Sequence, residues 1–142
     1  MLTLSSFGGW AGEALLREGF DNLHEHRAQK YGLQRRPDDY IVARKELNGA
    51  FIMPMSNDMI GFINPSVRDW LNSVLREAPE NAVDLILGAY RFTQLSQVWG
   101  FVRSDLGGAS RDMLSRRLST LVPKIVELAT APRTMRQRDG ST

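Results

Sequence analysis

The fold is decided by residues 50–67, which read AFIMPMSNDMIGFINPSV. Two apolar runs of β-forming residues, 51–53 and 59–63, are separated by the turn-forming residues 55–58, a pattern typical of a β-hairpin. Pro54 has no N–H to donate to a neighbouring strand, so we expect the first strand to lie at a sheet edge or to end there. The middle of the chain is therefore predicted to form a two-stranded hairpin.

The helix after the hairpin has the clearest start in the sequence. Asn64 precedes a proline, which keeps Asn64 out of the helical conformation and suits it to the N-cap position. Pro65 suits the first helical position, where a missing N–H breaks no hydrogen bond. The predicted helix continues to about Glu77, and we expect Trp70 and Leu71 to pack in its buried face.

Helical periodicity predicts further helices on both sides of the hairpin. Pro123 lies inside the last of them, so this segment should be kinked or divided there into two helices. A helix, a β-hairpin and a second helix form the skeleton of a winged helix. The predicted helices lie at residues 10–31 and 38–47 before the hairpin, and after residue 79 they follow apolar stripes at 83–90, 92–102 and 114–128.

These elements predict a mainly α fold with a small β-hairpin, in which a partial winged helix is followed by a helical segment. We expect a winged-helix-like domain at residues 1–78, a helical segment at 79–131 and a disordered basic tail at 132–142. The tail has no apolar face and is rich in arginine, threonine and glycine. The length of 142 residues suits one small domain or two very small ones.

Composition excludes several classes of protein. The chain has no cysteine, which removes disulfide frameworks, cysteine-based metal sites and thiol nucleophiles. No apolar run approaches the roughly 20 residues that span a bilayer, and the first nine residues do not resemble a secretory signal, so we expect a cytoplasmic protein without membrane contact. The net charge of +2 is unevenly distributed, with 10 basic and 12 acidic residues up to Val102 and 8 basic and 4 acidic residues from Arg103 onward.

No constellation of residues points to catalysis or to a metal. His24 and His26, the two histidines, are spaced by two residues and so point to different sides of a helix, which does not suit metal binding. Gly8, Gly9 and Gly12 match neither a P-loop nor a dinucleotide fingerprint. We therefore expect neither an enzyme nor a metal protein.

A nucleic-acid contact is one alternative function. The segment from Arg35 to Glu46 would hold the recognition helix of a DNA-binding winged helix, and the basic residues of this segment are Arg35, Arg36, Arg44 and Lys45. Asp38, Asp39 and Glu46 offset this charge, whereas a helix that reads a DNA groove normally has a clearer basic face. DNA binding therefore remains an alternative without positive support.

Two motifs resemble the winged-helix region of prokaryotic STAND NTPases, signal-transducing ATPases related to NACHT and NLR proteins. The first is ELNGAFI at residues 46–52, and the second is GFINPSVRDWL at residues 61–71, which contains Phe62, Pro65, Ser66, Arg68, Asp69 and Trp70. In that family a helix leads through such a motif into the wing, and a strand ending in a similar motif leads into the closing helix. Weaker similarity extends the resemblance over residues 1–102.

The resemblance implies a non-catalytic regulatory or interdomain module of a STAND-type signalling NTPase, many of which act in bacterial antiviral defence. The chain has no P-loop, so its implied partner is an ATPase core of the same or a neighbouring polypeptide, and ADP or ATP would bind only through that core. In related proteins a histidine at the position of Asn64 contacts the diphosphate of ADP, which makes Asn64 a candidate nucleotide-sensing residue. A small helical interaction protein is the remaining alternative.

Overall fold

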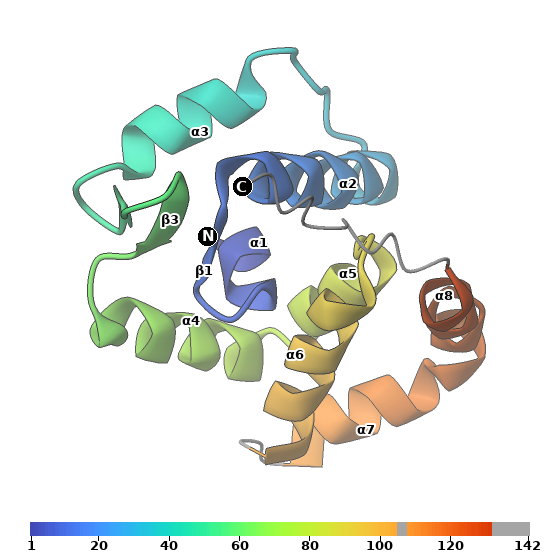
Figure 1. The fold of residues 1–142 in the computed structure, drawn as a ribbon. Helices are drawn as coiled ribbons and strands as arrows, with labels where there is room; N and C mark the ends of the chain where they lie inside the picture. Colours follow the sequence, from blue (N-terminus) through green and yellow to red (C-terminus); the bar gives the residue numbers. More distant parts are fainter. Residues whose placement is uncertain (105–107, 132–142) are drawn as a thin grey trace, which may run out of the picture.

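A computed structural model describes the backbone of residues 1–104 and 108–131 and the side chains of residues 1–103 and 111–131. The fold is mainly helical with a small antiparallel sheet, as the sequence predicted. Figure 1 shows the sheet, α3 and α4 on one side of the central helix α1 and the helices α5 to α8 on the other. The described elements are α1 (Leu2–Ser6), β1 (Trp10–Gly12), α2 (Glu13–Tyr31), α3 (Asp39–Leu47), β2 (Ile52–Pro54), β3 (Met59–Phe62), α4 (Pro65–Glu77), α5 (Glu80–Leu87), α6 (Phe92–Ser104), α7 (Gly108–Arg116) and α8 (Leu118–Thr130).

The hairpin of β2 and β3 is present where the sequence predicted it, and Pro54 ends the edge strand β2. The three strands have the order β1-β3-β2, so β3 is the central strand. Asn57 and Asp58 both have positive φ, of 60° and 56°, which is the conformation that a tight hairpin turn requires. The order helix, strand, helix, helix, strand, strand, followed by α4, is that of a winged helix.

The strand β1 corrects the prediction of a helix that begins at Trp10. Gly8 and Gly9 have φ values of 88° and 97°, which turn the chain after α1 in a conformation open to glycine. The chain then pairs with β3, with Trp10 opposite Gly61, and buries Ala11 in the core. The helix α2 therefore begins only at Glu13, because pairing with a distant strand outweighs the local helical pattern.

The division of the last helical segment is a second correction. The break lies at Arg117, between α7 and α8, and Pro123 is inside α8. A proline in a helix removes one backbone hydrogen bond, here to the carbonyl of Ser119. Ser119 and Pro123 are both exposed, so water can reach this part of the helix. The predicted disordered tail at 132–142 lies outside the described residues.

The apolar interior forms two clusters. The first joins the sheet to α1, α2 and α3 through Leu4, Ala11, Leu16, Tyr40, Ile52 and Ile60. The second lies mainly among α5 to α8, and it includes Leu23 from α2 and Leu75 from α4. The helical segment after residue 79 therefore packs directly on helices that precede it. None of the helices in the described part of the chain combines the length and apolarity needed to cross a bilayer.

Candidate protein-interaction surface

Asn64 caps helix α4, as its place before Pro65 predicted. Its Oδ1 accepts a hydrogen bond from the backbone N–H of Ser66 at 3.0 Å, and Pro65 occupies the first helical position. The side-chain amide nitrogen of Asn64 has no hydrogen-bond partner among the described residues, and the residue is exposed. Asn64 can therefore cap the helix with its oxygen and still offer two N–H groups to a ligand.

The other residues of the second motif divide between the core and the surface. Phe62 is half-buried and packs against the first core cluster. Ser66, Arg68 and Asp69 are exposed on the first turns of α4. The spacing of Ser66 and Asp69 suits a capping box, but the helix is capped by Asn64 instead, so these two residues do not form one.

The hairpin of β2 and β3, which we call the wing, shares an exposed apolar surface with α4. We call this surface the wing surface. The rings of Phe51 and Trp70 are stacked with their centroids 6.3 Å apart, and the Trp70 side chain is 53% exposed. The prediction that Trp70 packs in the core was therefore wrong, whereas Leu71 is buried. Trp70 lies on the side of the helix that faces the wing, where Phe51 is its aromatic neighbour. The wing surface consists of Phe51, Met53, Met55, Ile63 and Trp70, all of them exposed.

Gly61 allows the wing surface to extend across the central strand. An ideal Cβ at this position would lie 2.5 Å from Sδ of Met55, so the methionine side chain occupies the space that a side chain at residue 61 would need. Met55 therefore covers Gly61 on the outer face of β3, and Met53 is the residue of β2 that pairs with Gly61. Methionine is flexible and adapts to irregular apolar partners, so this arrangement suits a protein contact.

The basic residues proposed for nucleic-acid contact are not gathered into one free face. Nη2 of Arg44 lies 3.0 Å from Oε2 of Glu13, and the Tyr40 hydroxyl donates to Oε1 of Glu13 at 2.7 Å. Partial burial opposes ionisation of Glu13, but the hydrogen bonds from Arg44 and Tyr40 prevail and lower its pKa. Arg44 thus binds α3 to α2. Nη1 of Arg35 lies 4.0 Å from Oε1 of Glu25, while Arg36 and Lys45 are exposed.

The outward side of α3 is apolar as much as it is charged. Ile41 is 57% exposed and Val42 is 44% exposed, and Lys45 and Glu46 are exposed farther along the helix. A phosphate backbone is recognised mainly by arginine and lysine, and exposed isoleucine and valine contribute nothing to that attraction. This surface of α3 therefore suits a protein partner better than DNA.

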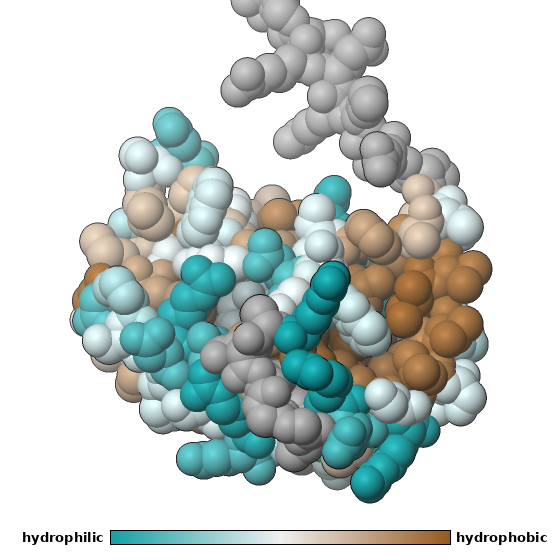
Figure 2. All heavy atoms as spheres, turned by 90° about the horizontal axis from the view of Figure 1, so that it is seen from below, coloured by the Kyte–Doolittle hydropathy of each residue, from teal (hydrophilic) through white to brown (hydrophobic). Residues whose placement is uncertain are grey.

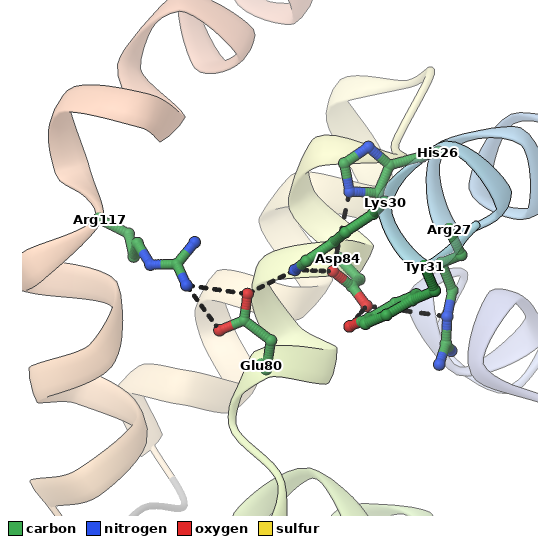
Figure 3. Close-up of polar contacts among 7 residues, drawn as sticks. All are labelled: His26, Arg27, Lys30, Tyr31, Glu80, Asp84 and Arg117. Carbon is green, nitrogen blue, oxygen red and sulfur yellow. Dashed lines mark hydrogen bonds and ion pairs between the residues drawn. The ribbon is translucent and has the colours of Figure 1, made fainter.

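An ionic cluster around the buried Asp84 is the polar feature that sequence reasoning missed (Figure 3). The carboxylate of Asp84 has no exposed surface, and it accepts hydrogen bonds from Nζ of Lys30 at 2.6 Å and from the Tyr31 hydroxyl at 2.9 Å. Lys30 also pairs with Glu80, which accepts two hydrogen bonds of 3.1 Å from Arg117. The cluster joins α2, α5 and the junction of α7 and α8.

The two histidines lie in different surroundings. Nε2 of His24 is 2.7 Å from Oδ2 of Asp39, and the backbone N–H of Arg36 together with this imidazole lowers the pKa of Asp39. Nε2 of His26 lies 3.7 Å from Oδ1 of Asp84, and burial lowers the pKa of His26 although this carboxylate opposes the shift. Among the described residues, no group of three or more side chains is arranged to hold a metal ion.

A second exposed apolar surface lies on α8. Leu118, Val122 and Val126 follow one another at a spacing of four residues and are 42%, 47% and 53% exposed. Figure 2 shows hydrophobic residues gathered at the right of the view, the side on which Figure 1 places α8. Soluble chains rarely expose large contiguous apolar patches unless these bind something, so both surfaces are candidates for protein contact.

No family model matches the chain, and no match was found among curated proteins or solved structures.

Proposed function

We propose that the chain is a non-catalytic regulatory module of a STAND-type signalling NTPase, and that it acts by docking its wing surface on an ATPase core of the same or a neighbouring polypeptide. The observation that carries the proposal is the exposed wing surface, in which Phe51 and Trp70 are stacked and Met53 and Met55 are exposed on and next to the strand β2 that follows Phe51. The order of elements of a winged helix and the two motifs at residues 46–52 and 61–71 support the choice of class. This proposal implies a bacterial cytoplasmic protein with a role in signalling such as antiviral defence.

The chemistry of the wing surface fits this role. Aromatic side chains that enter a partner's apolar pockets often supply a large share of the binding energy, and aromatic residues and methionine are enriched at protein interfaces. Met53 of the wing surface lies on β2 and Trp70 lies on α4, while Phe51, Met55 and Ile63 directly flank the strands β2 and β3. The inner sides of these three elements are held in the core by Ile52, Ile60 and Leu71. Replacement of the outward residues should therefore change binding with little effect on folding.

The test is binding of the chain to a purified P-loop ATPase domain of the STAND class encoded by the same genome. We expect binding by the wild type and at least tenfold weaker binding by a Phe51→Ser, Met55→Ser double variant, because removing two anchors of an interface costs more than about 1.4 kcal/mol. The matched control is Val122→Ser, Val126→Ser, which removes two exposed apolar residues from α8 and should bind normally.

Three outcomes would contradict the proposal. They are the absence of binding to the ATPase domain, loss of binding in the α8 variant rather than in the wing variant, and a salt-dependent shift of duplex DNA that requires Lys45. The second outcome favours a helical interaction protein that uses α8, and the third favours a winged-helix DNA-binding regulator.

The nucleotide-sensing role of Asn64 forms a second arm of the proposal. In a complex with the ATPase core, Asn64→Asp keeps an oxygen that caps α4 but replaces the amide N–H groups with negative charge. We expect this variant to release ADP faster than the wild type. Asn64→Ser, which also caps the helix, is the control for the loss of the amide alone. Equal ADP release by all three proteins would leave Asn64 as a helix cap only.

A further inference from the structure

The two edge strands of the sheet, β1 and β2, differ in whether their outward backbone groups are covered. At the outer edge of β2, Pro54 has no N–H, and the carbonyl of Ile52 accepts a hydrogen bond of 2.8 Å from the backbone N–H of Gly49. A β-bridge between Asn48 and Ile52 covers the same edge. Proline and a covering loop are common ways in which proteins prevent an edge strand from pairing with another chain.

Among the described residues, no proline and no loop covers the outer edge of β1 in this way. Gly9 accepts a hydrogen bond from the N–H of Phe62 at 3.1 Å, and Glu13 donates to Asp58 at 3.0 Å. Because alternate residues of an antiparallel strand face its partner, the backbone N–H and C=O groups of Trp10 and Gly12 point away from β3. The N–H and C=O of Trp10 and the N–H of Gly12 have no hydrogen-bond partner in the described part of the chain, whereas the C=O of Gly12, the N-cap residue of α2, accepts the first hydrogen bond of that helix.

A groove of about 650 Å³ runs beside this free edge. One side is formed by β1 together with Leu15 and Met59, and the other by Thr93 and Gln97, which lie one turn apart on α6. Apolar side chains thus flank the free backbone groups on the sheet side, while an amide and a hydroxyl face them from α6. This combination suits an extended peptide better than a compact small molecule.

The groove also contains a positive charge that is not neutralised. Arg68 lines it from the first turns of α4, and no carboxylate among the described residues lies within ion-pair distance of its guanidinium. The groove's other lining residues, which include Trp10 and Gln97, carry no charge. A carboxylate on the bound segment would therefore meet an arginine with no competing acidic side chain in this groove.

We propose that β1 binds an extended peptide, which adds to the sheet as a fourth strand and directs a carboxylate to Arg68. The N–H and C=O of Trp10 and the N–H of Gly12 would pair with the peptide, and Leu15 and Met59 would contact its apolar side chains. The carboxylate is an acidic side chain or the peptide's C-terminus. This site uses none of the five residues of the wing surface, so it goes beyond the function proposed above and can be tested separately.

Gly12 provides a variant that removes one edge donor without disturbing the fold. Its φ of −62° is the value that proline adopts, its N–H faces away from β3, and a Cβ there would lie 3.9 Å from Sδ of Met59, an ordinary contact. Gly12→Pro therefore deletes a peptide-binding N–H and keeps the β1–β3 pairing. Gly12→Ala is the matched control, because it adds a Cβ and keeps the N–H.

The probe is the tightest binder selected from a phage-displayed library of random dodecapeptides, synthesised with a fluorescent label and measured by fluorescence polarisation. We expect binding to weaken about tenfold in Gly12→Pro and in Arg68→Gln, and less than twofold in Gly12→Ala. The amide protons of Trp10 and Gly12 in the wild type should exchange more slowly when the peptide is bound, a readout that needs no variant.

Several results would overturn the assignment. They are a selected peptide that binds Gly12→Pro as tightly as the wild type, unchanged exchange at Trp10 and Gly12, and a library that gives no peptide with a Kd below about 100 μM, a modest affinity. Self-association of the wild type that Gly12→Pro abolishes would make a second copy of this chain the occupant and would equally contradict the peptide assignment.

Discussion

Nζ of Lys30 lies 2.6 Å from Oδ1 of Asp84, although the two residues are 54 positions apart and the Asp84 side chain has no exposed surface. The pair fixes α2 against α5 at one point. The Tyr31 hydroxyl completes the hydrogen bonding of the same carboxylate from the next residue of α2. Glu80, one turn earlier on α5, extends the contact to Arg117 and hence to the start of α8.

Loss of the Asp84 carboxylate should therefore destabilise the protein strongly. We expect Asp84→Ala to lower the free energy of unfolding by about 3 kcal/mol, because Lys30 then keeps only Glu80 as a partner, the Tyr31 hydroxyl loses its acceptor, and a cavity replaces a fully buried carboxylate. Glu80→Ala is the matched control on the same helix. Since Glu80 and its partners are partly exposed, its loss should cost about 1 kcal/mol or less. Urea unfolding of both variants would contradict this ranking if the two losses were equal.

His26 should make stability depend on pH. Burial lowers the pKa of His26 in the folded protein below its ordinary value of 6.5, against the attraction of Asp84, and Lys30 and Lys124 face the same ring. As the pH falls through 6.5, the unfolded chain takes up a proton at this position before the folded chain does, so the free energy of unfolding decreases. This contribution is fully present above pH 6.5 and is lost toward acid.

The measurement is urea unfolding from pH 7.5 to 5.5 with the wild type and His26→Gln. We expect the decrease toward acid to be smaller in the variant, because glutamine does not titrate. Parallel curves for the two proteins would show that another group causes the decrease. Asp39 and Glu13, whose pKa values are lowered in the fold, reduce stability only at more acidic pH, near the ordinary values of carboxylates.

The parts of the fold that depend on neighbouring residues could be predicted from the sequence. Asn64 and Pro65 start α4 by local conformational preference, and Pro54 ends β2 for the same reason. The strand β1 could not be predicted, because its three residues are held by pairing with β3, about 50 positions away. Local preference has little influence on so short a segment.

The ionic cluster around Asp84 and the wing surface could likewise be predicted only in part from the sequence. Asp84 is the one charged residue between Ala82 and Leu87, and an acid within such an apolar run is a signal for a buried carboxylate with a distant cation. The sequence contains that signal but cannot say that the cation is Lys30. Similarly, the apolar character of Trp70 was evident, but its exposure depends on how Phe51 is placed by the wing.

The Tyr40 hydroxyl provides a test of how α3 is fixed to α2. Tyr40 is 6% exposed and donates to the partly exposed carboxylate of Glu13. We expect Tyr40→Phe to lower the free energy of unfolding by about 1 kcal/mol, the usual contribution of such a hydrogen bond. Lys45→Ala, on the exposed side of the same helix, should change stability by less than about 0.5 kcal/mol. Thermal unfolding of both variants distinguishes the two positions, and an equal effect would show that the Tyr40 contact adds nothing.

We expect replacement by alanine to have different effects on stability at two buried glycines, Gly88 and Gly61. A Cβ at Gly88 would lie 2.9 Å from the backbone Cα of Leu23 and 3.0 Å from the carbonyl oxygen of Asp84, so the end of α5 would have to move away from α2. We expect Gly88→Ala to cost about 2–3 kcal/mol, in the range of overpacked cores. At Gly61 the obstacle is the thioether of Met55, which is flexible and exposed and can rotate away.

Gly61→Ala should therefore change stability by less than about 1 kcal/mol, a small value for a buried position, and displace Met55 from the outer face of β3. The methyl resonance of Met55 should shift in an NMR spectrum of this variant, while the resonances of core methyl groups should not. A large loss of stability in Gly61→Ala would mean that Met55 is fixed rather than adaptable. The wing surface would then be a rigid apolar face, and its methionines would select partners by shape instead of adjusting to them.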